Sequence, residues 1–108
     1  MPSLKLQTEF QSLKEQGQFS HVNHWLAISY KKNTEGTLRW GWTISKKIGN
    51  AVVRNRLRRW GKEMVRGQNH ELDINFIFKA KGKEFYKSLS HEDFNKAFSK
   101  VFSKITKE

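Results

Sequence analysis

The residues best suited to chemistry in this sequence are cations gathered in one short segment, residues 46–66, which reads KKIGNAVVRNRLRRWGKEMVR. Eight lysines and arginines stand there against one acid, Glu63, so the segment carries +7 of the chain's net charge of +11. Arginine is the commonest of them, and its planar guanidinium matches the geometry of phosphate oxygens. The pattern predicts a surface that binds a polyanion.

Helical spacing places most of these cations together. On a helix over residues 51–66, an apolar stripe is expected from Val53, Leu57, Trp60 and Met64, with Trp60 as a core anchor. The opposite face would carry Arg54, Arg58, Arg59, Lys62 and Arg66, with Asn55 among them and Arg56 at the boundary. Like charges spaced by four residues repel within an isolated helix. We therefore interpret this face as a nucleic-acid-binding surface rather than a solvated one, with Lys46, Lys47 and Asn50 beside the free N–H groups of its first turn.

Other function classes fit the remaining residues less well. A metal-dependent protein nuclease needs clustered carboxylates or histidine ligands, and the acids here are scattered, with Glu71 and Asp73 best explained as turn residues. The four histidines, His21, His24, His70 and His91, show no ligand spacing. The absence of cysteine excludes disulfides and thiolate metal sites. A structural RNA-binding protein and a DNA-binding module both remain open from composition alone.

The elements that must position this helix follow from hydrophobic periodicity. We expect a short helix at 8–15, strands at 25–30, 38–45 and 72–79, and a closing helix at 90–105 whose stripe is Phe94, Ala97, Phe98, Val101, Phe102 and Ile105. The first two strands are expected to pair as a hairpin across the turn at 31–37. The chain of 108 residues suits one α+β domain, with helices packed on a small sheet.

The segment SKKIGNAVVRNRLRRW resembles the signature of the protein subunit of bacterial ribonuclease P, with Arg54, Asn55 and Arg56 as its Arg-Asn-Arg core. The flanking segments LRWGWTI, EFQSL and LDINFIF stand in the order and approximate spacing of that family. The resemblance covers nearly the whole chain, as one domain over 1–108 with the signature at 45–66.

The resemblance implies an α-β-β-β-α-β-α sandwich with a small central sheet and a left-handed crossover. It also implies a cytoplasmic ribonucleoprotein that removes the 5′ leader of precursor tRNA. The RNA subunit would carry the active site and the magnesium ions, while the protein would bind no cofactor and contribute no catalytic residue. The partners implied are ribonuclease P RNA and precursor tRNA, with no membrane and no DNA.

Carried onto this chain, the resemblance implies two sets of site residues. The RNA-binding set is Lys46, Lys47, Asn50, Arg54, Asn55, Arg56, Arg58, Arg59, Lys62 and Arg66. The leader cleft would be lined by Phe10, Lys14, Ile28 and Thr43, with Arg54 and Asn55 at its margin. The chain departs from the family at Lys14 and Ile28, where aromatic residues are frequent. It departs again at Gly61, which interrupts the signature helix at an expected cost of ~1 kcal/mol relative to alanine.

Overall fold

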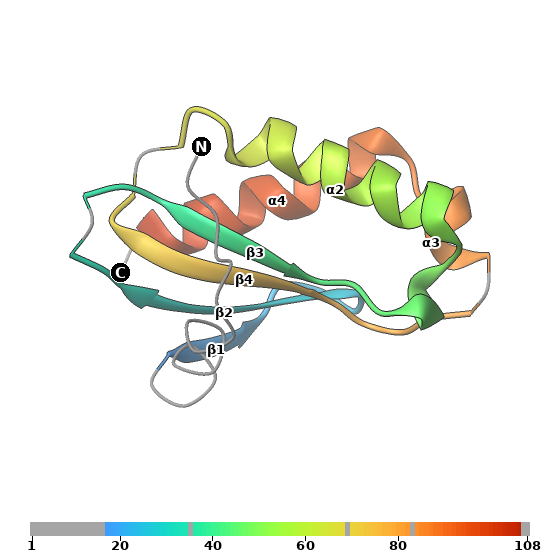
Figure 1. Cartoon of the computed structure of the whole chain (residues 1–108), viewed down its shortest axis with the longest axis horizontal. Coiled ribbons are helices and arrows are strands. Elements are labelled where there is room, and N and C mark those ends of the chain that lie inside the picture. Colours follow the sequence, from blue (N-terminus) through green and yellow to red (C-terminus); the bar gives the residue numbers. More distant parts are fainter. Residues whose placement is uncertain (1–16, 35, 69, 83, 107–108) are drawn as a thin grey trace.

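The computed structural model describes residues 17–34, 36–68, 70–82 and 84–106, and it has two layers, a four-stranded sheet and helices across one of its faces (Figure 1). The elements in chain order are β1 (Gln18–His21), β2 (Leu26–Lys32), β3 (Arg39–Thr43), the 3-10 turn η1 (Lys46–Ile48), α2 (Ala51–Val65), β4 (Leu72–Phe78), α3 (Phe85–Ser88) and α4 (His91–Thr106). The α+β prediction is confirmed. The helix expected at 8–15 lies outside the described residues.

The order of strands in the sheet is β1-β2-β4-β3, so the expected hairpin between the second and third strands is wrong. Strand β4 lies between them, antiparallel to β2 and parallel to β3, and α2 forms the crossover from β3 to β4. The physical reason is burial. Five of the seven residues of β4 are buried, and a strand this apolar is stabilised most when it has a neighbour on each side.

The core lies between the sheet and α4. The expected stripe of α4 is buried along its whole length, and Phe98 stacks on Phe76 of β4 with ring centroids 4.7 Å apart. The predicted N-terminal cap of this helix is confirmed, because the Ser90 hydroxyl accepts a hydrogen bond from the Asp93 amide at 3.0 Å. Aromatic contacts of this kind fix α4 over the centre of the sheet.

Two short elements were not predicted from periodicity, namely β1 and α3. Strand β1 is mostly exposed, so it carries little alternation that a sequence pattern would reveal. Helix α3 has one turn, and Tyr86 within it is fully buried. The Tyr86 hydroxyl donates to the carbonyl oxygens of Trp25, at 3.1 Å, and Lys79, at 2.5 Å, and burial raises the pKa of this hydroxyl well above its usual value. These contacts tie α3 to the ends of β2 and β4.

The buried side of α2 differs from the expected stripe. Its buried residues are Val53, Leu57, Gly61 and Val65, while Trp60 and Met64 are half-buried at the margin. Gly61 explains the rotation. A Cβ at this position would lie 2.7 Å from Cζ3 of Trp42 on β3, and nearer still to Cη2. Gly61, which was expected to destabilise the helix, is the point where α2 packs directly on the indole ring of Trp42.

Candidate nucleic-acid interface

The N-terminus of α2 is built by the residues that precede it. Ile48, in η1, is 1% exposed and anchors the segment in the core, so that Lys46 and Lys47 on the same turn are held at the surface. The Asn50 side chain caps the helix, because its Oδ1 accepts a hydrogen bond from the Val53 amide at 3.0 Å. Asn50 therefore positions the helix, and its Oδ1 is already committed within the chain.

The exposed side of α2 and its end carries most of the predicted cations. Arg59, Lys62 and Arg66 are exposed, and Arg66 is the residue at which the helix ends. Arg58 is half-buried and its Nη1 donates to Asn55 Oδ1 at 3.0 Å, which orients the guanidinium along the helix surface. Arg54 is half-buried, and its buried Nε has no hydrogen-bond partner among the described residues. The exposed cationic groups of Arg59, Lys62 and Arg66 suit external phosphate oxygens.

Arg56 lies apart from the other cations, as its place at the boundary of the predicted face suggested. Its Nη2 donates to the backbone oxygens of Tyr86, at 2.8 Å, and Lys87, at 3.1 Å, in the last turn of α3. Its guanidinium carbon lies 5.0 Å from the centre of the Trp60 ring. Carbonyl groups at the end of a helix lack partners within that helix, and Arg56 satisfies two of them. Arg56, the second arginine of the Arg-Asn-Arg core, thus links α3 to α2.

The single acid of the segment points away from the cations. Glu63 Oε2 lies 3.4 Å from Nε2 of His91, the first residue of α4. The His91 ring stacks on Trp60 with centroids 4.6 Å apart and planes inclined by 12°. Trp60 also meets Phe94 edge to face, so it packs against the core as expected of an anchor, although it is only half-buried. Among the described residues Glu63 pairs across to α4 and forms no ion pair with a cation of α2.

The structure separates two of the residues expected in one cleft. Ile28 is fully buried and pairs with Phe76, which places it on the face covered by the helices. Thr43 is exposed, and its Oγ1 accepts a hydrogen bond at 2.8 Å from Nδ2 of Asn75. Both residues lie on the face of the sheet that is turned away from the helices. The expectation that Ile28 lines the cleft is therefore wrong, because residues an even number apart share one face and Ile28 belongs to the core set. Phe10 and Lys14 lie outside the described residues.

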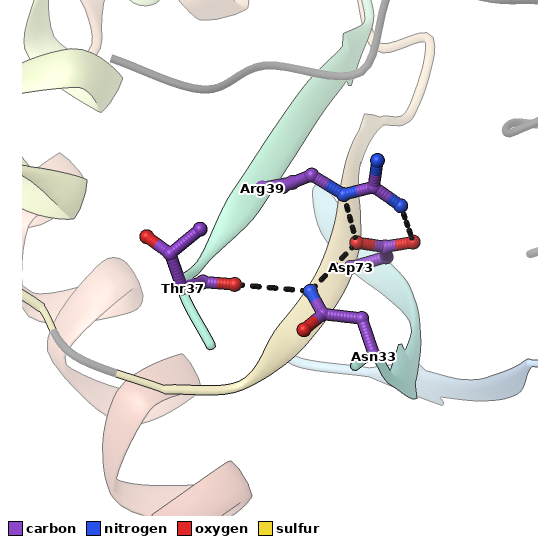
Figure 2. Close-up of polar contacts among 4 residues, drawn as sticks. All are labelled: Asn33, Thr37, Arg39 and Asp73. Carbon is purple, nitrogen blue, oxygen red and sulfur yellow. Dashed lines mark hydrogen bonds and ion pairs between the residues drawn. The ribbon is translucent and has the colours of Figure 1, made fainter. Parts of the chain in front are cut away.

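Arg39 is a cation that stabilises the fold through an ion pair with Asp73. Figure 2 shows its guanidinium against Asp73, with Nε 2.7 Å from Oδ1 and Nη2 2.6 Å from Oδ2. Asn33 Nδ2 donates to the same Oδ1 at 2.8 Å and to the Thr37 oxygen at 3.0 Å. Burial alone would raise the pKa of Asp73, but the hydrogen bonds from Arg39 and Asn33 and the charges of Arg39 and Lys31 hold it below its usual value. Asp73 was assigned to a turn, and it is instead the buried ionic link between β4 and β3.

Sequence reasoning also missed Asn75, which shares a face with Asp73. The alternation of LDINFIF, with its large apolar residues at every second position, was a signal for this face. Two further properties bear on the site. Over the ranges that the structure describes, no group of three His, Asp or Glu side chains is placed to hold a metal ion. In the same ranges, no helix has the length and apolar character needed to span a membrane.

Comparison with known proteins gives consistent matches. The family model for ribonuclease P matches residues 2–106. The ribonuclease P protein component of Bacillus mycoides is 29% identical over 101 residues, which cover 94% of this chain and 88% of that protein. Among solved structures, the Staphylococcus aureus RNase P protein has a TM-score of 0.82 at 23% identity, covering 99% of this chain and 96% of its own. The Thermotoga maritima protein has a TM-score of 0.83 at 22% identity, covering 96% and 97%.

Proposed function

The chain belongs to the ribonuclease P protein family, and from this premise we propose that it binds a ribonuclease P RNA and the 5′ leader of precursor tRNA. In this role it assists the endonucleolytic cut that produces the mature 5′ end of tRNA. Helix α2 and the turn before it contact the RNA subunit, and the sheet face that carries Thr43 contacts the leader. This function is assigned to the cytoplasm, where tRNA precursors are processed.

One observation carries the proposal, namely the basic face of α2. We define this face by Lys46, Lys47, Arg54, Arg58, Arg59, Lys62 and Arg66. The only acid in the segment, Glu63, pairs with His91 of α4. A rigid array of cations without nearby acids stores electrostatic repulsion that an RNA backbone relieves, with release of counterions from the RNA.

The neighbouring residues give the basic face its fixed geometry. Asn50 caps the helix, Gly61 seats it on Trp42, and Arg56 holds it to α3. Since α2 is fixed at both ends and at its middle, its cations are presented with little further loss of conformational freedom on binding. Such preorganisation favours a defined RNA site over diffuse attraction.

The chemistry of cleavage belongs, in this proposal, to the RNA subunit and its magnesium ions. The protein contributes binding and orientation: cations for the RNA backbone, and polar groups such as the Thr43–Asn75 pair for the leader. Phe10 and Lys14 are assigned to the leader path from the sequence alone. No side chain of the protein is assigned to proton transfer or to metal binding.

The proposal is tested by reconstitution. Purified protein is incubated with precursor tRNA and magnesium, with and without a bacterial ribonuclease P RNA, at a magnesium concentration where that RNA alone cleaves poorly. The expected result is specific 5′ cleavage by the mixture and none by the protein alone. Specific cleavage by repurified protein alone would contradict the assignment of chemistry to the RNA. Lack of any stimulation, with RNA binding retained, would favour a structural RNA-binding role.

A further inference from the structure

Strand β1 carries two aromatic side chains on the sheet face that is turned away from α2 and α4. The register pairs Phe19 with Ser29, and His21 with Ala27. Directly opposed residues of antiparallel strands point to the same side, and Ile28, between Ala27 and Ser29, points to the helix side. Phe19 and His21 therefore lie on the face that also carries Thr43 and Asn75, at the β1 edge of the sheet (Figure 1).

These two rings form an exposed pair. Phe19 is 57% exposed, whereas the other phenylalanines that the structure describes lie in the core or pack against it. Its ring meets His21 edge to face at 4.9 Å with an interplanar angle of 85°. Lys79 Nζ lies 2.6 Å from His21 Nδ1. Because an ammonium group can only donate, the imidazole Nδ1 is the acceptor in this contact.

A polar partner lies across the same face. Asn75 pairs with Ser29, so it stands in the same row as Phe19, two strand spacings or about 10 Å away. Its Nδ2 donates to Thr43, while its buried Oδ1 has no hydrogen-bond partner among the described residues. The exposed rings and the polar Asn75–Thr43 pair thus lie on one face of the sheet, and proteins bind unpaired bases by combining aromatic stacking with polar contacts.

We propose that Phe19 and His21 form a stacking site for one nucleobase of the single-stranded leader, with Lys79 beside them for the adjoining phosphate. This rests on the proposed function and extends the leader path from Thr43 to the β1 edge. Every base has an apolar face that stacks on an aromatic ring, so the contact would add affinity with little sequence preference. The Thr43–Asn75 pair lies further along the same face, toward β3.

Charge favours RNA over a second copy of the chain as the occupant. Strand β1 is an edge strand, and exposed edges can pair with another chain. A chain with a net charge of +11 repels its own copies, however, and Lys79 adds positive charge at this very edge. The same charge attracts a polyanionic strand.

The experiment uses the reconstituted holoenzyme and two substrates, precursor tRNA with a leader of several nucleotides and the same tRNA with a one-nucleotide leader. The readout is the ratio of the two dissociation constants for each variant. Phe19→Ala is expected to weaken binding of the long-leader substrate about tenfold relative to the trimmed one, which converts to ~1.4 kcal/mol. Phe19→Trp should restore the ratio. Ser20→Ala, on the same strand but on its other face, is the matched control.

A fluorescent base locates the contact. With 2-aminopurine placed at successive leader positions, one position should be quenched on binding and should brighten in Phe19→Ala. An unchanged ratio together with unchanged quenching would overturn the stacking site. So would a dimer of the free protein that dissociates in Phe19→Ala, because the β1 edge would then be an interface between copies. Failure of the wild-type protein to stimulate the RNA subunit on either substrate would instead count against the proposed function.

Discussion

Two regions of this molecule hold arginine in opposite ways. At the β3–β4 junction, Arg39 meets the buried carboxylate of Asp73 through two hydrogen bonds, and Asn33 completes the carboxylate's shell (Figure 2). On the basic face of α2, Arg58 and Arg59 form no ion pair with an acid among the described residues, and Glu63 pairs with His91 of α4. The difference teaches that a count of cations does not define an RNA-binding surface. Cations with an internal partner hold the fold, and those without one are available to a ligand.

The largest effect should come from breaking the internal pair. Asp73→Ala removes the buried carboxylate that pairs with the Arg39 guanidinium, whose side chain is 24% exposed. Loss of one partner from a buried ion pair costs several kcal/mol, and partial access of water to Arg39 places the expected loss near the lower end, at about 3 kcal/mol. This loss in the free energy of unfolding is measured by urea denaturation, monitored by circular dichroism. Glu71→Ala, an exposed acid next to the same strand, should change the free energy of unfolding by less than about 0.5 kcal/mol.

The same pair should make stability depend on pH in a defined direction. The pKa of Asp73 is lower in the folded chain than in the unfolded one, so the unfolded chain takes up the proton first as the pH falls. The stabilising contribution is complete above the unfolded-state pKa of about 4 and is lost as the pH falls through the lower folded-state value. The difference in unfolding free energy between the wild type and Asp73→Asn should therefore narrow below about pH 4. A constant difference from pH 7 to pH 3 would show that the charge of Asp73 is not what stabilises the junction.

The basic face should respond in affinity rather than stability. Replacing Arg58 and Arg59 together by alanine removes up to two phosphate contacts, so the log–log dependence of RNA affinity on salt should become shallower by about 1–2 units. The matched control is Lys100→Ala with Lys104→Ala on the exposed side of α4, which should leave that slope nearly unchanged. Equal changes in both double variants would mean that the protein attracts RNA by net charge alone.

The smallest effect is expected at Glu63. Glu63→Gln removes an exposed pair with His91, and such pairs contribute less than about 0.5 kcal/mol to stability. Since Glu63 faces α4 rather than the cations, RNA affinity should stay the same or rise slightly. A marked fall in affinity, measured by filter binding at fixed salt, would contradict the view that this carboxylate takes no part in the RNA interface.

Much of the fold could be predicted because its signals are local. The alternation of β3 and β4 and the stripe of α4 come from residues within one element, and each matches the structure within one or two residues at the strand ends. The strand order could not be predicted in the same way. A short turn between β2 and β3 favours a hairpin locally, but the insertion of β4 depends on a strand from far along the chain.

In the candidate site, too, local patterns predicted some features, whereas others depend on contacts distant in sequence. The cations of α2 were identified from spacing alone. Arg59, Lys62 and Arg66 are exposed, whereas Arg54, Arg56 and Arg58 are half-buried. Ile28 was misplaced because the first five residues of β2 are all buried, so periodicity gives no sign of which face each residue takes. Only the pairing of β2 with β4 shows that Ile28 lies on the face covered by the helices. Arg56 and Gly61 likewise depend on α3 and Trp42, partners that no local pattern reveals.

The position of β4 has a consequence for how the protein is made. This strand pairs with both β2 and β3, yet it is the last of the four described strands to be synthesised. Until residue 78 has emerged, β2 and β3 have no common neighbour and the ionic link at Asp73 cannot form. The sheet therefore closes in a late step that depends on contacts distant in sequence, which slows folding relative to a simple hairpin arrangement. The basic helix is synthesised before β4, so nearby RNA can meet it before the sheet beneath it is complete.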